Sequence, residues 1–380
     1  MDELAGYRAE IDQIDGELVA LFQRRMEVVS QVAAYKRERG MEVLQPQREQ
    51  QVLDKAEALL TDKSLAPAVR QLFETLMAVS RSLQHEALGD DQVLPQVQQW
   101  KASPRVVYPG AEGAFSEQAA LDFFGQEAAP KALTTFEKAA AAVKAGQADY
   151  AVLPIENSTA GSVEETYRLL GVYGLSIVGE QLVRVRHHLL GLPGSKLEDI
   201  RQVRSHPQAI AQCHGFLLTH PRMAAVAGIN TALCARMVAE TGDASAAAIA
   251  SLRSARQYGL TVLSQDIQDK RYNVTRFIVA AAAPIQVAGA DKATIMFCLD
   301  NKAGQLARVL TALGRQGMNL TKLESRPIPD TPWAYTFYAD IQWTRDRRAL
   351  YRALEEAGRD AREMRLLGLY QAARKEEDEG

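Results

Sequence analysis

Residues 150–161 read Tyr-Ala-Val-Leu-Pro-Ile-Glu-Asn-Ser-Thr-Ala-Gly, an apolar run that opens directly into small polar residues. The apolar part predicts a buried β-strand over Tyr150–Ile155. Ser162 and Glu165 have the spacing of a capping box and predict the start of a helix. A strand, a polar loop and a helix N-terminus in this order offer free backbone N–H groups to an anion, and they are typical of an α/β fold.

Strands and helices alternate on both sides of this stretch. Arg105–Tyr108 predicts a strand, and Ser116 is placed to cap a helix that ends at Gly125. A second group of strands and helices runs from about Arg184 to Leu260. Tyr272–Val279 then predicts a late strand that returns to the first group, so the region is expected to form two α/β lobes.

Four loop motifs in this region resemble those of prephenate dehydratases. In chain order they are Tyr108–Ser116, Pro154–Gly161, Ser205-His206-Pro207-Gln208-Ala209 and Asn273-Val274-Thr275-Arg276-Phe277. The resemblance covers residues 104–283. It implies a two-lobed fold similar to the periplasmic-binding-protein architecture, with the active site in the cleft. The implied reaction removes carbon dioxide and the ring hydroxyl from prephenate and gives phenylpyruvate.

The resemblance assigns the departure of that hydroxyl to Thr275. A threonine is a poor proton source, but its hydroxyl can donate a hydrogen bond to the leaving oxygen. Arg276 is expected to orient the substrate carboxylates. Glu156 is either a structural acid or a proton partner, whereas His187 and His188 are expected to be structural. The implied substrate-binding residues are Glu156, Asn157, Ser158, Thr159, Gly161, His206, Thr275, Arg276 and Phe277.

The N-terminal segment has a different periodicity. From Asp2 to Gly40 there is no proline, and apolar residues recur at steps of three and four. This pattern predicts one amphipathic helix of about 35 residues, about 50 Å long. Such a helix needs a partner helix, which we expect from another chain. Two shorter helices are predicted over about 47–60 and 66–87.

Cations on the long helix indicate a ligand. Arg25 and Lys36 are 11 residues apart, so they share a face about 16 Å apart and could bracket one small dianion. Arg8 lies about 42 Å of helix from Lys36 and would have to come from a second, antiparallel subunit. The alternative is a coiled-coil-like dimerisation module whose cations are solvated.

These residues resemble the all-helical class of chorismate mutase. The matching positions are Arg8, Arg25, Lys36, Arg48, Glu49, Ser80 and Gln84. The resemblance implies that the arginines hold the carboxylates of chorismate, and that Lys36 and Gln84 bond the ether oxygen and Glu49 the ring hydroxyl. The rearrangement is pericyclic, so catalysis needs a fixed substrate conformer and donors at the ether oxygen rather than a nucleophile. Gln45 departs from the family, which often has an acidic residue there.

The C-terminal segment follows a boundary at Pro284 and Gly289. Its pattern predicts a βαββαβ, ferredoxin-like sandwich over residues 292–369. The segment resembles the regulatory ACT domain, which in dehydratases binds phenylalanine across a domain dimer. The implied effector residues are Gly304, Gln305, Leu306, Asn319, Glu324, Ser325, Arg326 and Pro327, with Gln305 in place of the usual alanine. The alternative is a purely structural sandwich.

Composition restricts the class of protein. The chain has 380 residues, 47% hydrophobic and 24% charged, with a formal net charge of -3. These values disfavour disorder and nucleic-acid binding, and no apolar run is long enough for a membrane span. The three cysteines are widely spaced, and the N-terminus lacks the pattern of a signal peptide, so we expect the reducing cytoplasm. Cys213, His214 and His220 do not have zinc spacing, and neither a metal nor a cofactor is expected.

The sequence therefore predicts a multidomain enzyme. The expected domains are a helical mutase (1–90), a two-lobed dehydratase (104–283) and an ACT domain (289–372), with a linker over about 88–104 and a frayed acidic tail at 375–380. The expected function is conversion of chorismate to prephenate and then to phenylpyruvate, with feedback by L-phenylalanine. We expect a homodimer through the N-terminal helices and the ACT domain, or a tetramer. The alternatives are a monofunctional prephenate or arogenate dehydratase with a mutase-like dimerisation arm, and a non-enzymatic small-molecule sensor.

Overall fold

The computed structural model describes residues 3–41, 45–88 (only the backbone of 46, 82 and 85–88), 99–285, 287–328, 331, 333–343 and 347–374. It divides into two units, Met1–Leu94 and Pro95–Gly380. Most of the predicted linker and the whole of the predicted acidic tail lie outside the described residues.

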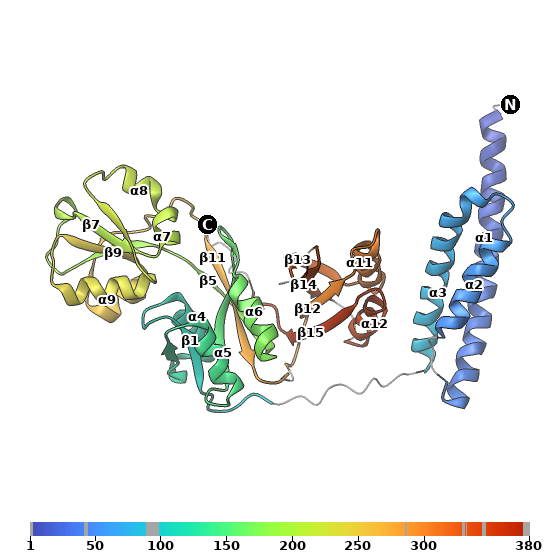
Figure 1. Ribbon diagram of the computed structural model, residues 1–380, viewed down its shortest axis with the longest axis horizontal. Helices are drawn as coiled ribbons and strands as arrows, with labels where there is room; N and C mark the ends of the chain where they lie inside the picture. The colour runs from blue at the N-terminus through green and yellow to red at the C-terminus, as the bar shows by residue number, and fades with distance from the viewer. Residues whose placement is uncertain are drawn as a thin grey trace. The chain divides into compact units, whose positions relative to one another are not determined.

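The described part of the first unit contains three α-helices (Figure 1). They are α1 (Glu3–Arg39), α2 (Pro46–Ala58) and α3 (Ala66–Leu88), with a short 3-10 helix, η1 (Lys63–Leu65), before α3. The predicted long N-terminal helix is confirmed as α1. Its buried apolar positions, Val29 and Ala33, lie in its second half, and Leu53, Met77 and Ala78 of the other helices are also buried. Apolar side chains in its first half, such as Ile11 and Leu18, remain exposed.

The second unit begins with a lobe built on five strands in the order β5-β11-β3-β1-β2. The strands are β1 (Val106–Pro109), β2 (Lys131–Leu133), β3 (Tyr150–Asn157), β5 (Ser176–Arg184) and β11 (Val274–Ala281), with β4 (Gly161–Ser162) pairing with β3. The helices of this lobe are α4 (Phe115–Phe124), α5 (Phe136–Lys144) and α6 (Glu164–Tyr173), with a 3-10 turn, η2 (Gln126–Ala128). Tyr150–Leu153 and Ile155 are buried, as the apolar run predicted.

The second lobe has its own five-stranded sheet, in the order β10-β6-β9-β7-β8 (Figure 1). The strands are β6 (His188–Gly191), β7 (Gln202–Ser205), β8 (Ala224–Ala227), β9 (Ala246–Ala250) and β10 (Thr261–Ser264). The helices are α7 (Pro207–Gln212), α8 (His214–Leu218), α9 (Thr231–Thr241) and α10 (Leu252–Tyr258), with a 3-10 turn, η3 (Leu197–Asp199). The chain enters the lobe after β5 and leaves it before β11. The predicted late strand that returns to the first lobe is therefore confirmed as β11.

Two predicted helix caps are wrong. Helix α4 begins at Phe115 with Ala114 as its N-cap, so Ser116 lies inside the helix rather than at its cap. Ser162 is not part of a capping box, because it belongs to β4 and its hydroxyl donates to Glu324 far along the chain. Helix α6 begins after Val163 without a side-chain cap. At Ser162 a tertiary contact thus overrides a locally favourable pattern.

The C-terminal domain has the predicted βαββαβ order. Its elements are β12 (Lys292–Leu299), α11 (Gln305–Arg315), β13 (Asn319–Pro327), β14 (Tyr335–Gln342), α12 (Arg347–Gly358) and β15 (Glu363–Tyr370). The strands lie in the order β13-β14-β12-β15. Alternate residues of the strands, such as Ile295, Phe297 and Ile341, form a core with Val309 of α11 and Leu350 of α12. The opposite face of this sheet therefore carries the intervening residues.

Strand β15 joins this domain to the first lobe. It pairs with β5 in parallel, Gly368 opposite Ile177, so that both sheets become parts of one ten-stranded sheet. Gly368 approaches Ile177 so closely that an added Cβ would overlap the carbonyl group of that residue. Glycine is therefore required where the two domains meet.

Candidate active sites and the domain junction

Arg25 and Ser80 connect α1 to α3 in the helical unit. Nη1 of Arg25 donates to Oγ of Ser80 and, at 3.2 Å, to the carbonyl oxygen of Leu76. Burial lowers the pKa of Arg25. The face of α1 that packs inward thus carries a guanidinium group, where a helical scaffold alone would carry an apolar side chain.

Lys36 and Gln84 are buried polar residues of the same unit, 8% and 7% exposed. Burial lowers the pKa of Lys36, and the charge of Glu49 partly opposes this effect. Nε2 of Gln84 donates to the carbonyl oxygen of Ser80 at 3.3 Å, whereas Oε1 of Gln84 has no partner among the described residues. A buried amide whose oxygen has no partner among the described residues is costly unless a ligand uses it, and a buried ammonium group beside it suits a polar or anionic ligand.

Of the remaining predicted residues of this site, one is paired with an arginine and two are exposed. Glu49 accepts a hydrogen bond from Nη1 of Arg81 at 2.6 Å, so Arg81 is a neighbour of the site that sequence reasoning missed. Arg48 is exposed and its Nη1 lies 3.4 Å from Oε1 of Gln51. Arg8 is exposed on the same helix as Arg25, 17 residues or about 25 Å before it. One chain therefore does not bring Arg8 to the other cations.

Thr275 and Asn157 lie opposite each other on the antiparallel strands β11 and β3. Nδ2 of Asn157 donates to Oγ1 of Thr275 at 2.9 Å and to Oδ1 of Asn273 at 2.7 Å. Ser158 continues the pairing: its N–H donates to the carbonyl oxygen of Val274, and its Oγ accepts from the N–H of Val274. The register of two strands thus brings together motifs that are more than a hundred residues apart.

The polar loop after β3 holds the Asn157 side chain in place. Oδ1 of Asn157 accepts from the backbone N–H groups of Thr159 and Ala160, both at 3.0 Å, and from Oγ1 of Thr159 at 2.7 Å. Gly161, with φ +84°, then turns the chain back into β4 opposite Asn157. The small residues of this loop are needed because the backbone folds tightly around one carboxamide.

Gln212, at the end of α7 in the second lobe, reaches the same group of residues. Its Nε2 donates to Oγ1 of Thr159 at 2.7 Å, and its Oε1 accepts from Nδ2 of Asn273 at 3.1 Å. Nε2 of His187 lies 2.9 Å from the same oxygen. Sequence reasoning missed Gln212 because an isolated glutamine in a helix carries no signal. Asn273 belongs to the motif at residues 273–277 but had no role assigned to it, and His187 was expected to be structural only.

The loop before α4 holds the two lobes together at a second place. The hydroxyls of Ser251 and Ser254 each donate to the carbonyl oxygen of Gly113 at 2.9 Å, and Arg253 pairs with Glu117 at 2.6 Å. Gly113 has φ +83°, and a Cβ there would lie 2.9 Å from the Cα of Ser254. The motif 108–116 therefore serves lobe contact in this structure.

Two further predicted residues have structural positions. Nδ1 of His206 accepts from the backbone N–H of Gln208 at 3.2 Å and so caps α7, and burial lowers the pKa of this histidine. Phe277 is 2% exposed and packs in the core of the first lobe, with Tyr108 and Val279. The prediction that Phe277 contacts substrate is corrected, because its side chain points into this core.

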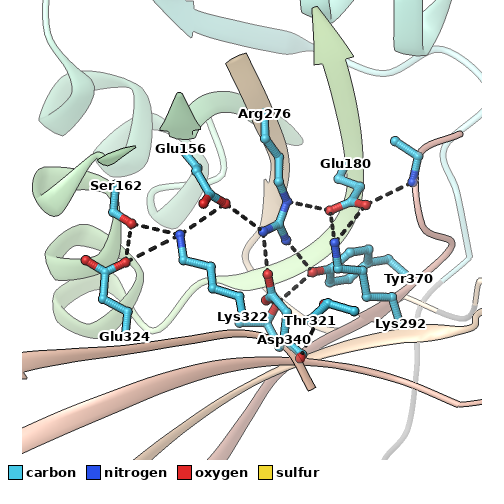
Figure 2. A network of polar contacts seen from close by, with 12 residues as sticks. Glu156, Ser162, Glu180, Arg276, Lys292, Thr321, Lys322, Glu324, Asp340 and Tyr370 are labelled. Carbon is cyan, nitrogen blue, oxygen red and sulfur yellow. Dashed lines mark hydrogen bonds and ion pairs between the residues drawn. The ribbon is translucent and has the colours of Figure 1, made fainter. Parts of the chain in front are cut away.

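Arg276 corrects another prediction. It is 7% exposed and lies between Glu180 of the first lobe and Asp340 of the C-terminal domain (Figure 2). Nε donates to Glu180 at 2.6 Å, Nη1 pairs with Asp340, and Nη2 donates to the Tyr370 hydroxyl at 2.9 Å. Because the acids and the tyrosine occupy its guanidinium, Arg276 is not placed to orient substrate carboxylates. Its neighbour Thr275 points to the opposite side of the strand.

Glu156 joins the same junction. Its Oε2 lies 3.6 Å from Nη1 of Arg276 and 3.1 Å from Nζ of Lys322 in β13 (Figure 2). Of the two roles left open for Glu156, these ion pairs favour the structural acid. Lys292 of β12 completes the network, with Nζ 3.0 and 2.9 Å from the two carboxylate oxygens of Glu180.

The predicted effector residues divide between two faces of the C-terminal sheet. Glu324 binds the hydroxyl of Ser162, and Arg326 lies 3.6 Å from Glu164, so both face the first lobe. Ser325, between them, is exposed and points to the other face. The alternation of β13 therefore separates the members of one sequence motif.

The other effector residues lie at two ends of the same sheet. Gly304, with φ +75°, caps α11, and the neighbouring Gln305 turns inward to donate to the carbonyl oxygen of Asp360 at 2.7 Å. Leu306 packs against the core of this domain and Pro327 is exposed at the end of β13. Asn319, at the start of β13, pairs with Gln342 at the level of Lys292, so one chain does not bring it to the Gly304 end of the sheet.

Within the ranges that the structure describes, no group of three or more His, Cys, Asp or Glu residues is arranged to hold a metal ion. None of the described helices combines the length and apolar character of a membrane span. Cys213, Cys234 and Cys298 are buried and free.

Three family models match the chain. Residues 7–85 match chorismate mutase type II, residues 106–284 match prephenate dehydratase and residues 293–359 match the ACT domain.

Relatives extend these matches over the full length. A bifunctional chorismate mutase/prephenate dehydratase of Neisseria gonorrhoeae is 34% identical and covers 98% of each chain. Arogenate dehydratase 2 of Petunia hybrida is 40% identical over 70% of this chain and 71% of its own length. The structure of a prephenate dehydratase from Arthrobacter aurescens in complex with L-Phe is 34% identical, covers 70% of this chain and 90% of its own, and has a TM-score of 0.64. The chain therefore belongs to the family of bifunctional chorismate mutase/prephenate dehydratases, in which one polypeptide carries both enzymes and a regulatory ACT domain.

Proposed function

We propose that Thr275 assists the dehydration of prephenate and that Asn157 holds its hydroxyl in place. The 2.9 Å contact between these two side chains supports the assignment. In the reaction the C–C bond to the ring carboxylate breaks and its electron pair completes the aromatic ring as the C–O bond to the hydroxyl breaks. Aromatisation drives this step, so the enzyme has mainly to stabilise the departing hydroxide, which a hydrogen-bond donor can do.

The test is the dehydratase rate of Thr275→Ala and Thr275→Ser on prephenate, with the mutase rate of the same chain as an internal control. We expect Thr275→Ala to lose at least about 100-fold in kcat, and Thr275→Ser to retain most of it, because the serine keeps the donor. Equal rates in wild type and Thr275→Ala would remove the assignment. An assay with arogenate beside prephenate distinguishes the two substrates after which relatives are named.

The mutase site is assigned to Arg25, Lys36, Glu49, Ser80 and Gln84 of one chain, with Arg48 at its edge. The two buried polar side chains of Lys36 and Gln84 support this assignment, since their donors suit an ether oxygen that gains charge. Lys36→Ala should abolish mutase turnover and leave the dehydratase rate unchanged. Lys55→Ala, on the exposed side of α2, is the matched control.

A second chain is needed to complete that site. Ile11, Ile14, Leu18 and Leu21 are 50–62% exposed along the first half of α1, and an apolar stripe of this length is expected to be covered. An antiparallel α1 of a partner would cover it and would bring the partner's Arg8 to the pocket. Replacement of Leu18 by Asp should therefore lower both the oligomeric state in light scattering and the mutase rate.

L-phenylalanine is the effector proposed for the ACT domain. The bound L-Phe in the Arthrobacter aurescens relative supports this proposal, as do the motif residues Gly304 and Glu324–Pro327. The dehydratase rate should fall as phenylalanine is added, and Ser325→Ala, on the exposed face of β13, should weaken the response. A wild-type dehydratase rate that does not change with phenylalanine concentration would exclude feedback.

The proposed compartment is the reducing cytoplasm, which suits the three buried free cysteines.

A further inference from the structure

The amide of Asn157 has only one orientation that satisfies its neighbours. Its Oδ1 faces the backbone N–H groups of Thr159 and Ala160, which can only donate. The other end of the amide is therefore the NH2 group, and its two hydrogens go to Asn273 and Thr275. This assignment needs no choice of hydrogen positions, because fixed backbone donors decide it.

The Thr275 hydroxyl consequently accepts from Asn157 and keeps its own hydrogen. A hydroxyl has one hydrogen to donate, and Asn157 offers it no acceptor. Among the described residues Oγ1 of Thr275 makes no hydrogen bond other than the one from Asn157. The hydrogen is therefore available to the leaving oxygen of the substrate.

The same reasoning extends to the second lobe through Thr159. Its hydroxyl donates to Oδ1 of Asn157, so it must accept from Gln212, whose Nε2 lies 2.7 Å away. This fixes the amide of Gln212 with Oε1 towards Asn273 and His187. Nε2 of His187 must then carry a hydrogen and donate.

His187 ends the chain of hydrogen bonds as a buried neutral ring. It is 2% exposed, and its Nδ1 has no partner among the described residues. The edge of Phe115 packs against it, with ring centroids 5.9 Å apart. Burial lowers the pKa of His187, which favours the form with a hydrogen on Nε2 alone.

We infer that Gln212 is a positioning residue of the dehydration: the second lobe supplies it to set the direction of every hydrogen bond from His187 to Thr275. This inference rests on the proposed role of Thr275. If the amide of Gln212 were reversed, the Thr159 hydroxyl would donate to Gln212 and the amide of Asn157 would lose one of the three donors that hold it. The Thr275 hydroxyl would then be less firmly directed towards the substrate.

The Gln212→Glu variant tests the direction of the hydrogen bonds between His187 and Thr275. The ionised glutamate has no donor for Thr159, whereas the protonated glutamate has one donor for Thr159 and one acceptor for Asn273, which are the roles that Gln212 fills. We expect kcat on prephenate at neutral pH to fall at least about tenfold, with a smaller change in KM. The ratio of variant to wild-type kcat should recover as the pH is lowered and the glutamate becomes protonated.

Gln212→Met is the matched control, because it keeps the side-chain length without any hydrogen bond. Its loss of kcat should be similar at neutral pH and should not recover in acid. Mutase turnover and the melting temperature of each full-length variant report whether the chain is folded. A Gln212→Glu ratio that stays flat with pH, or a kcat equal to wild type, would overturn the inference.

Thr275→Ala separates this inference from the proposed function. If Thr275→Ala keeps its activity, the function assigned to Thr275 fails. If Thr275→Ala is inactive while both Gln212 variants are as active as wild type, only the positioning role fails.

A measurement on the wild-type protein does not depend on any variant folding. With ¹⁵N-labelled histidine, the His187 resonances, assigned by their loss in His187→Asn, should show a hydrogen on Nε2 and a bare Nδ1. A hydrogen on Nδ1 with a bare Nε2 would require the reverse orientation of Gln212 and would overturn the inference.

Discussion

Nζ of Lys322, on strand β13 of the ACT domain, lies 3.1 Å from Oε2 of Glu156, the residue directly before Asn157 in the dehydratase. The same ammonium group donates to Oγ of Ser162 at 2.8 Å. Strand β13, which carries the Glu-Ser-Arg-Pro motif, is therefore in direct contact with β3, which carries Asn157 of the proposed dehydratase site.

Lys322→Met is expected to weaken feedback without removing activity. The substitution keeps the length of the side chain and removes its ion pair with Glu156, so a change in β13 would no longer be transmitted to β3 by charge. The phenylalanine concentration for half inhibition should rise at least about fivefold, since allosteric coupling energies are of this size, while the uninhibited rate stays within about twofold. Lys302→Met, an exposed lysine paired with Asp300, is the control. Identical inhibition curves for Lys322→Met and wild type would contradict this prediction.

Asp340→Asn is expected to destabilise the second unit by about 3–5 kcal/mol, because it removes one partner of a buried ion pair and leaves Arg276 with less compensation. Thermal unfolding followed with the mutase unit as an internal reference measures the change. Asp300→Asn, on the exposed end of the same domain, should be neutral within about 0.5 kcal/mol. A melting temperature for Asp340→Asn equal to that of Asp300→Asn would show that the junction contributes nothing.

The same carboxylate predicts a pH dependence. Burial alone would raise the pKa of Asp340, but the charges of Arg276 and Lys292 outweigh it and lower the pKa. A carboxylate with a lowered folded-state pKa contributes stability above its unfolded value and loses it as the pH falls through the folded value. The stability difference between wild type and Asp340→Asn should therefore narrow below about pH 4. A difference that is constant from pH 7 to pH 3 would contradict the assignment.

Gly368→Ala is expected to disturb the contact between β15 and β5. The added methyl group would overlap the carbonyl of Ile177, and backbone atoms cannot move aside as a side chain can. We expect a loss of about 1–3 kcal/mol in the second unit, measured by chemical denaturation. Gly314→Ala, in helix α11 with open space around it, is the control and should be neutral or stabilising.

The mutase rate is expected to decline at high pH as Lys36 loses its proton. Burial lowers the pKa of Lys36 and Glu49 partly raises it again. Glu49→Gln removes the opposing charge, so the alkaline limb of the kcat/KM profile should move to lower pH. Glu57→Gln, in the same helix and paired with Arg70, should leave the profile unchanged. Movement of the limb to higher pH in Glu49→Gln would contradict the electrostatic argument.

Local pattern predicted most elements of the fold. Helix α11 (Gln305–Arg315) stands where the predicted βαββαβ order has its first helix, since its apolar period and the glycine before it are both local signals. The cap at Ser116 was predicted wrongly because α4 begins one residue earlier, at Phe115. The cap at Ser162 was predicted wrongly because Glu324, which accepts from its hydroxyl, lies 162 residues away. A pattern of neighbouring residues cannot predict a contact over that distance in the sequence.

The roles of the site residues could be predicted only where the residues belong to a local motif, because long-range contacts leave no local pattern. Thr275 and Asn157 each belong to a recognisable motif, but only the strand register shows that the two side chains are neighbours. Arg276 was misassigned because three of its partners come from β5, β14 and β15, two of them beyond the next domain boundary. Gln212 could be found only after the lobes were placed against each other.

The shared sheet and its buried charges have a practical consequence for engineering a desensitised enzyme. Truncation before β12 would remove Asp340, Tyr370 and Lys292. It would expose Glu180 and Arg276 to solvent and would leave β5 as an edge strand that is unpaired on one side. Such a fragment is expected to aggregate by strand pairing at that edge. Point replacements on the exposed face of β13 spare this shared interior, so they offer a route to feedback resistance that keeps the catalytic half of the molecule intact.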